Sequence, residues 1–84
     1  MNEQEYIDII QFRKKEYKYS GYNELVITAK DLMELTEDPY NPAMPEAIRW
    51  CMLEGDRLLC EEDSENYSAV YYCDNLSNER RKMF

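Results

Sequence analysis

The stretch PEAIRWCMLEG, from Pro45 to Gly55, constrains the fold most, because it is the most apolar helical pattern in the chain and contains the only tryptophan. Pro45 suits the first turn of a helix, where its missing N–H is not needed. Gly55 stands where a glycine would close a helix. Apolar side chains, Trp50 among them, recur along one face at helical spacing. We therefore predict a helix over residues 45–54 that forms the centre of the core.

Local signals predict the remaining elements. Asn2 and Glu5 have the spacing of a capping box, with asparagine in place of serine or threonine. Thr28 is placed to cap a second helix, with Asp31 at its third position. After residue 55 the pattern becomes strand-like, with two apolar runs around a polar turn. The predicted elements are helices over 3–17, 29–36 and 45–54, a short strand over 24–27, a hairpin over 57–62 and 68–74, and a tail over 77–84.

The order of these elements indicates the fold class. A chain of 84 residues has the length of a single domain, which we place at residues 1–84. We predict an α+β fold with three helices and a small antiparallel sheet that ends in a C-terminal β-hairpin. Helix, strand, helix, helix, strand, strand is also the order of a winged-helix fold, with residues 45–54 in the position of the recognition helix. No motif assigns the chain to a named family.

Charge is the second strong feature of the sequence. The net charge is −8 and there is no histidine. The segment from Tyr19 to Glu79 contains 14 acidic and 3 basic residues, a net charge of −11. Such a segment repels phosphate backbones and attracts basic protein surfaces. The plainer interpretation, that the acids only keep a small domain in solution, stays open. Basic residues gather in two clusters, Arg13, Lys14, Lys15 and Lys18 near the start and Arg80, Arg81 and Lys82 near the end.

Acidic residues near the predicted turns, together with two tyrosines, are the candidate partner-binding residues. The candidates are Glu37, Asp38, Tyr40, Glu54, Asp56, Glu61, Glu62, Asp63, Glu65 and Tyr67. Tyrosine is a common interface anchor, and acids around it steer a basic partner. Tyr67 lies in the predicted hairpin tip, so we expect it to be exposed. Tyr40 either anchors a partner or packs over the end of the second helix.

Two functions from different classes follow from this surface. The first is a non-enzymatic protein-binding module whose carboxylates imitate a phosphate backbone and occupy the nucleic-acid channel of a basic partner protein. In size and charge the chain resembles small acidic inhibitors encoded by phages and mobile elements, anti-CRISPR proteins among them, and this resemblance implies the same kind of inhibition. The alternative is a small DNA-binding accessory or transcriptional regulator of the winged-helix type, which would use the two basic clusters.

The predicted recognition helix argues against direct nucleic-acid binding. Residues 45–54 contain one cation, Arg49, and the predicted hairpin tip is acidic, so both would face phosphate with the wrong sign. The connection over residues 37–44 is also longer than the turn of a helix-turn-helix motif.

Enzyme, metal and cofactor chemistry have little support. Without histidine, serine and cysteine nucleophiles lose their usual base. Cys51, Cys60 and Cys73 form no C-x-x-C pair, which favours reduced thiols in the core over a zinc site. The stretch 63–68 lacks the ligands and the glycine that a calcium loop needs. No nucleotide-binding motif is present. We expect a protein that is not an enzyme and has no metal or cofactor.

The first residues, MNEQEYIDII, lack the basic and apolar regions of a signal peptide. No apolar run has the length of a membrane span. We therefore expect a cytoplasmic protein without membrane contact. Its oligomeric state is open, because residues 25–27 or the hairpin could pair across a two-fold axis into a homodimer.

Overall fold

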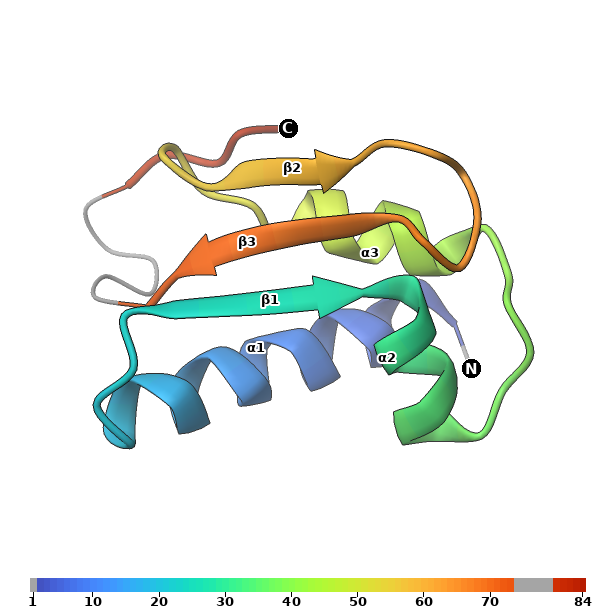
Figure 1. The fold of residues 1–84 in the computed structure, drawn as a ribbon, viewed down its shortest axis with the longest axis horizontal. Helices are drawn as coiled ribbons and strands as arrows, with labels where there is room; N and C mark the ends of the chain where they lie inside the picture. The colour runs from blue at the N-terminus through green and yellow to red at the C-terminus, as the bar shows by residue number, and fades with distance from the viewer. Residues whose placement is uncertain (1, 74–79) are drawn as a thin grey trace.

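The structure is a computed structural model that describes residues 2–73 and 80–84 (Figure 1). Within those residues, three helices combine with a three-stranded antiparallel sheet, so the predicted α+β class is confirmed. The elements are α1 (Glu3–Tyr19), β1 (Glu24–Thr28), α2 (Ala29–Thr36), α3 (Ala43–Trp50), β2 (Arg57–Cys60) and β3 (Ser68–Tyr72). Predicted strand residues after 73 and the first residues of the predicted tail, 77–79, lie outside the described residues.

Local capping fixes the starts of α1 and α2. The side chain of Asn2 accepts a hydrogen bond from the backbone N–H of Glu5 at 3.0 Å. At α2 a full capping box forms, because the Thr28 hydroxyl accepts from the Asp31 N–H at 2.9 Å and the Asp31 carboxylate accepts from the Thr28 N–H at 3.0 Å. Such reciprocal bonds satisfy donors that a helix start leaves unpaired. As a result α2 occupies the range that the sequence indicates.

Helix α3 differs from its prediction at both ends. It begins at Ala43 and ends at Trp50 rather than continuing to residue 54. The helix stops because residues 51–53 are all buried, and three consecutive residues cannot all face the core from one side of a helix. Gly55 adopts a left-handed φ of 100° in the following turn and does not cap the helix. Trp50 is 46% exposed and therefore lies outside the buried face of α3.

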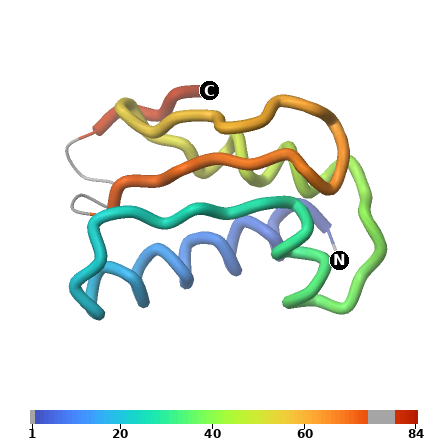
Figure 2. Tube along the Cα trace, in the orientation of Figure 1, coloured from blue at the N-terminus to red at the C-terminus, as the bar shows by residue number. Residues whose placement is uncertain are grey.

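The sheet has the strand order β1-β3-β2, with β3 in the centre and antiparallel to both neighbours. Helix α1 packs against α3 and β1, as Figure 1 shows, and α3 also packs against β3. Figure 2 shows the α2–α3 and β2–β3 connections at one end of the molecule and the turn between α3 and β2 at the other. These two ends separate the predicted site residues into two groups.

The core contains large aromatic side chains whose hydroxyls all have partners. Tyr6 and Tyr71 have no exposed area. The Tyr71 hydroxyl donates to the Ile48 carbonyl at 2.7 Å, and the Tyr6 hydroxyl donates to the Asp38 carboxylate at 3.0 Å. A buried tyrosine combines a large apolar ring with one polar atom that needs a hydrogen bond. These contacts therefore join β3 to α3, and α1 to the connection between α2 and α3.

Lys14 is the one member of the first basic cluster that the fold buries. Its side chain is fully buried. The Nζ atom donates to the Cys51 carbonyl at 3.2 Å and lies 5.0 Å from the centre of the Tyr71 ring. Burial lowers the pKa of Lys14, although the nearby Asp56 carboxylate opposes this change. Lys14 points into the core because position 14 falls on the same helix face as Tyr6, Ile7 and Ile10.

Cys51 and Cys73 are buried cysteines, and Cys60 is partly buried. Burial raises the pKa of the Cys51 thiol from its ordinary value of 9.0 to about 12. A thiol whose pKa is higher in the folded state than in the unfolded state makes its full contribution to stability at pH values below the unfolded-state pKa. This contribution is lost as the pH rises from the unfolded-state pKa to the folded-state pKa.

We therefore expect the free energy of unfolding to fall between pH 9 and pH 12, in part because Cys51 resists ionisation. The Cys51→Ala variant should be less stable at pH 8 by about 1–2 kcal/mol because of the lost packing, but should lose less stability as the pH rises. Urea unfolding measured at intervals from pH 8 to pH 11 tests this. The Cys60→Ala variant is the control and should follow the wild-type slope. Parallel curves for Cys51→Ala and wild type would contradict the prediction.

Candidate protein-binding surface

Four carboxylates occupy the connection between β2 and β3, and we call them the acidic loop. They are Glu61, Glu62, Asp63 and Glu65. All four residues are exposed. The connection begins where the register between β2 and β3 shifts, between Leu58 and Cys60. Such an irregularity bends a strand and ends its pairing, so the chain leaves the sheet and presents these carboxylates to solvent.

Backbone hydrogen bonds fix the acidic loop against the start of α2. The N–H of Ala29 donates to the Tyr67 carbonyl at 2.8 Å, and the N–H of Lys30 donates to the Glu65 carbonyl at 2.9 Å. These are among the first N–H groups of α2, which have no acceptor within their own helix. Inside the loop, the Tyr67 N–H donates to the Ser64 carbonyl at 3.1 Å, and the Asn66 N–H donates to the Ser64 hydroxyl at 3.1 Å. The four carboxylates therefore extend from a fixed backbone.

The prediction that Tyr67 is exposed is wrong. Only 1% of Tyr67 is exposed. The residue continues the alternation of β3 by one position, since Ala69 and Tyr71 point into the core as well. Arg49 covers the ring, with its guanidinium carbon 5.4 Å from the ring centre and its Nη1 donating to the Tyr67 hydroxyl at 3.3 Å. Extending the alternation to position 67 would have identified Tyr67 as a core residue.

Tyr40 lies near the acidic loop. It is partly buried against the core and, with Arg49 and Asp63, lines a hollow of about 280 Å³. Arg49 also pairs with Asp63 at 3.9 Å. Burial raises the pKa of Tyr40, and the charge of Asp63 adds to this effect. Of the two interpretations that the sequence leaves open for Tyr40, the structure supports packing and also leaves part of the side chain accessible.

Asp56 does not belong to an exposed acidic surface, contrary to its prediction. It is 1% exposed and accepts three hydrogen bonds. Its donors are the Leu53 N–H at 2.9 Å, the Tyr72 N–H at 2.9 Å and the Arg80 Nη1 at 2.8 Å. Glu54 is exposed, but it lies at the opposite end of β2 from the acidic loop. A strand of four residues spans about 13 Å, so neither residue contributes to the loop surface.

Glu37 and Asp38 end α2 and have different roles. Glu37 is exposed and adopts a left-handed φ of 59° as the C-cap of α2. Asp38 is half-buried, and the hydrogen bond from the Tyr6 hydroxyl lowers the pKa of its carboxyl. The Asn41 side chain donates to the same hydroxyl at 2.7 Å. Asp38 therefore ties the α2–α3 connection to α1 rather than presenting a charge to a partner.

The two basic clusters are largely engaged within the fold. Arg80 donates to the Tyr72 carbonyl at 2.5 Å and to the Glu54 carbonyl at 3.2 Å, in addition to its ion pair with Asp56. Lys82 donates to the Trp50 carbonyl and lies 3.2 Å from the centre of the Trp50 ring. Lys14 is buried and Arg13 pairs with Glu16, whereas Lys15, Lys18 and Arg81 are exposed.

No group of three or more histidine, cysteine, aspartate or glutamate side chains within residues 2–73 and 80–84 is placed to hold a metal ion. The helices of the same described part of the chain are too short or too polar to cross a membrane.

No protein-family model, curated protein or solved structure matches this chain. Its function is therefore inferred from the surface of the domain.

The Asp56→Asn variant should lose about 3 kcal/mol in its free energy of unfolding, because it removes the buried charge that accepts hydrogen bonds from the Leu53 N–H, the Tyr72 N–H and the Arg80 guanidinium. Urea unfolding at pH 7 measures this change. Glu54→Gln removes an exposed carboxylate two positions away in the same turn and should stay within about 0.5 kcal/mol of wild type. Equal stabilities of the two variants would show that the Asp56 contacts contribute little.

Proposed function

We propose that this chain is a non-enzymatic protein-binding module whose acidic loop docks on a basic surface of a partner protein and thereby inhibits a nucleic-acid-handling protein. The observation that carries this proposal is the acidic loop itself, with four exposed carboxylates on a backbone that is hydrogen-bonded to α2. A binding surface that is already ordered loses less conformational entropy when a partner docks.

The run of negative charge in the acidic loop supports imitation of a nucleic acid. Glu61, Glu62 and Asp63 are consecutive and exposed. Clustered charges of one sign steer a partner of opposite sign and raise its association rate. A basic channel that accepts phosphates would meet several negative charges close together on this loop.

The absence of histidine and the state of the thiols support a non-enzymatic role. Burial keeps Cys51 protonated at neutral pH, so its thiolate is not available as a nucleophile. The thiols of Cys51 and Cys60, which form no disulfide, also support a cytoplasmic location, because reduced cysteines are typical of reducing compartments.

A winged-helix-type DNA-binding accessory is the second candidate. The element order and the sheet order β1-β3-β2, in which β2 and β3 pair antiparallel, favour it. The surface opposes it, since the exposed residues of α3 include Glu46 and Trp50, and the acidic loop occupies the position of the wing. The engagement of Arg80 within the fold further weakens this candidate.

Charge reversal in the acidic loop tests the first proposal. The tagged wild-type protein and the double variant Glu61→Lys, Glu62→Lys are used to recover partners from a lysate of the native cells, with and without nuclease and at rising salt. We expect a partner that survives nuclease and elutes with salt, and a double variant that binds it at least tenfold more weakly, about 1.4 kcal/mol.

The matched control is the double variant Glu16→Lys, Glu54→Lys, which changes the net charge equally at exposed positions outside the loop. It should retain the partner. Equal recovery by the loop variant and wild type would contradict docking through the loop, and recovery that disappears with nuclease would favour the DNA-binding candidate.

A further inference from the structure

β1 is an edge strand, and the hydrogen bonds at its two ends show which of its residues bond to β3. The Cys73 N–H donates to the Asn23 carbonyl at 2.8 Å, and the Ala29 N–H donates to the Tyr67 carbonyl at 2.8 Å. Both pairs continue the register in which Leu25 faces Tyr71. In an antiparallel ladder, residues alternate between bonding the neighbour and facing away. The odd-numbered residues of this segment therefore bond β3, and the even-numbered residues direct their N–H and C=O groups to the open side.

Within the described part of the chain, nothing pairs with the centre of this open edge. Thr28 confirms that the even-numbered residues face away from β3, because its N–H donates to the Asp31 carboxylate. Val26 and Glu24 remain, and no residue within 2–73 and 80–84 supplies a partner for the outward N–H and C=O of Val26. Val26 is also 49% exposed. An edge with unpaired backbone groups is a template on which another strand can pair.

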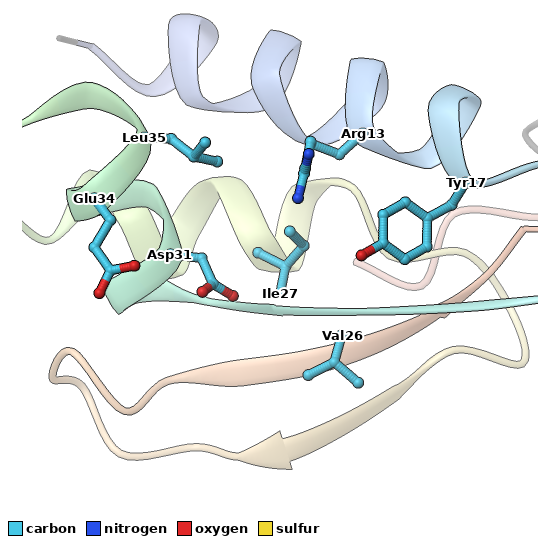
Figure 3. A pocket seen from close by; sticks show the side chains of 7 residues that line it. All are labelled: Arg13, Tyr17, Val26, Ile27, Asp31, Glu34 and Leu35. Carbon is cyan, nitrogen blue, oxygen red and sulfur yellow. The ribbon is translucent and has the colours of Figure 1, made fainter. Parts of the chain in front are cut away.

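A hollow of about 360 Å³ lies beside this edge, between α1, α2 and β1 (Figure 3). The Ile27 side chain points toward α1, and the Val26 side chain points to the opposite side of β1. A strand added to β1 would place alternate side chains on the α1 side of the sheet. Those side chains would enter the hollow, whose apolar lining includes Ile27 and Leu35.

Charge selects the kind of segment that fits. Arg13 lines the hollow but already pairs with Glu16 at 3.4 Å and lies 5.6 Å from the centre of the Tyr17 ring. Asp31 and Glu34 line the other wall with no cation paired to them in the described residues. The hollow is therefore negative at the α2 end. Lysine or arginine on the inward positions of an added strand would meet these two carboxylates.

A second copy of this chain fits the edge less well. Each copy has a net charge of −8. Pairing of two β1 strands would bring the Asp31 and Glu34 carboxylates of both copies toward one interface, where like charges repel.

We propose that the free edge of β1 binds an extended basic segment of another protein, which adds a fourth strand to the sheet through Val26. The segment alternates basic residues, which enter the hollow beside Asp31 and Glu34, with residues of any kind on the outer face. This site goes beyond the acidic loop and does not require it, so the two proposals can fail separately.

The probe is a fluorescein-labelled seven-residue peptide of alternating valine and lysine, and its binding is measured by fluorescence anisotropy and by NMR shifts of the protein amides. We expect saturable binding with the largest shifts at Val26 and Glu24. A peptide of alternating valine and glutamate should bind at least tenfold more weakly. Shifts confined to the acidic loop would overturn the proposal.

Backbone methylation of the peptide tests strand addition directly. When the peptide adds antiparallel to β1 with its lysines directed inward, the valine N–H groups face β1. Methylation of the valine backbone nitrogens should therefore weaken binding at least tenfold. Methylation of the lysine backbone nitrogens should leave the affinity within about threefold, because an edge strand hydrogen-bonds to only one side of the added strand. Equal effects of the two methylation patterns would overturn the proposal.

Protein variants provide the matching test. Val26→Pro removes the outward N–H and should abolish binding. An edge strand tolerates proline at such a position, because the lost N–H does not pair with the sheet. Val26→Thr retains the N–H and should bind as wild type does. Glu34→Lys should weaken binding several-fold, whereas the double variant Glu61→Lys, Glu62→Lys should retain it. If Val26→Pro does not fold, the methylated peptides still decide. Concentration-dependent dimerisation in sedimentation that the peptide competes away would assign the edge to a second copy and overturn the proposal.

Discussion

The arrangement of α3, β2 and β3 depends on the hydrogen bonds that the buried Asp56 carboxylate accepts. It accepts hydrogen bonds from Leu53 and Tyr72 of the backbone and from the guanidinium of Arg80. The first bond forms the turn that follows α3, and the second continues the pairing of β3 beyond the start of β2. A buried charge is tolerated only when its oxygens have partners, and these three bonds link the turn after α3, the end of β3 and Arg80 to one side chain.

The same region explains the burial of Lys14. Its ammonium lies close to the Tyr71 ring and the Cys51 carbonyl, below the Asp56 turn. The negative charge of Asp56 favours the ammonium form and the charge of Arg80 opposes it, while burial remains the stronger effect. The domain thus places two cations and one anion near its core, and the small apolar core packs around them. This arrangement uses charged residues for structure in a chain whose exposed surface is mainly acidic.

Structural features that depend on residues close together in the sequence could be predicted from it. Features that depend on contacts between residues far apart in the sequence could not. Helix α2 could be placed because Thr28 and Asp31 contact each other across three positions. The end of α3 could not, because it depends on the Asp56 turn and on the burial of residues 51–53. The candidate site shows the same division. The exposure of the acidic loop follows from its local composition, but the burial of Asp56 depends on Arg80, which is 24 positions away. Tyr67 was recoverable from the alternation of β3.

The way in which the acidic loop is held has a consequence for how its specificity can change. The hydrogen bonds between the loop and α2, and those within the loop, are made by backbone groups or by the Ser64 hydroxyl, and the Arg49 side chain adds a bond to the Tyr67 hydroxyl. None of these bonds uses the side chains of Glu61, Glu62 or Glu65. The loop therefore keeps its shape whatever side chains occupy those three positions. Backbone groups hold the loop in place, whereas side chains form its recognition surface. Exchanging these three residues can therefore change which partner the domain binds without changing how the loop is held.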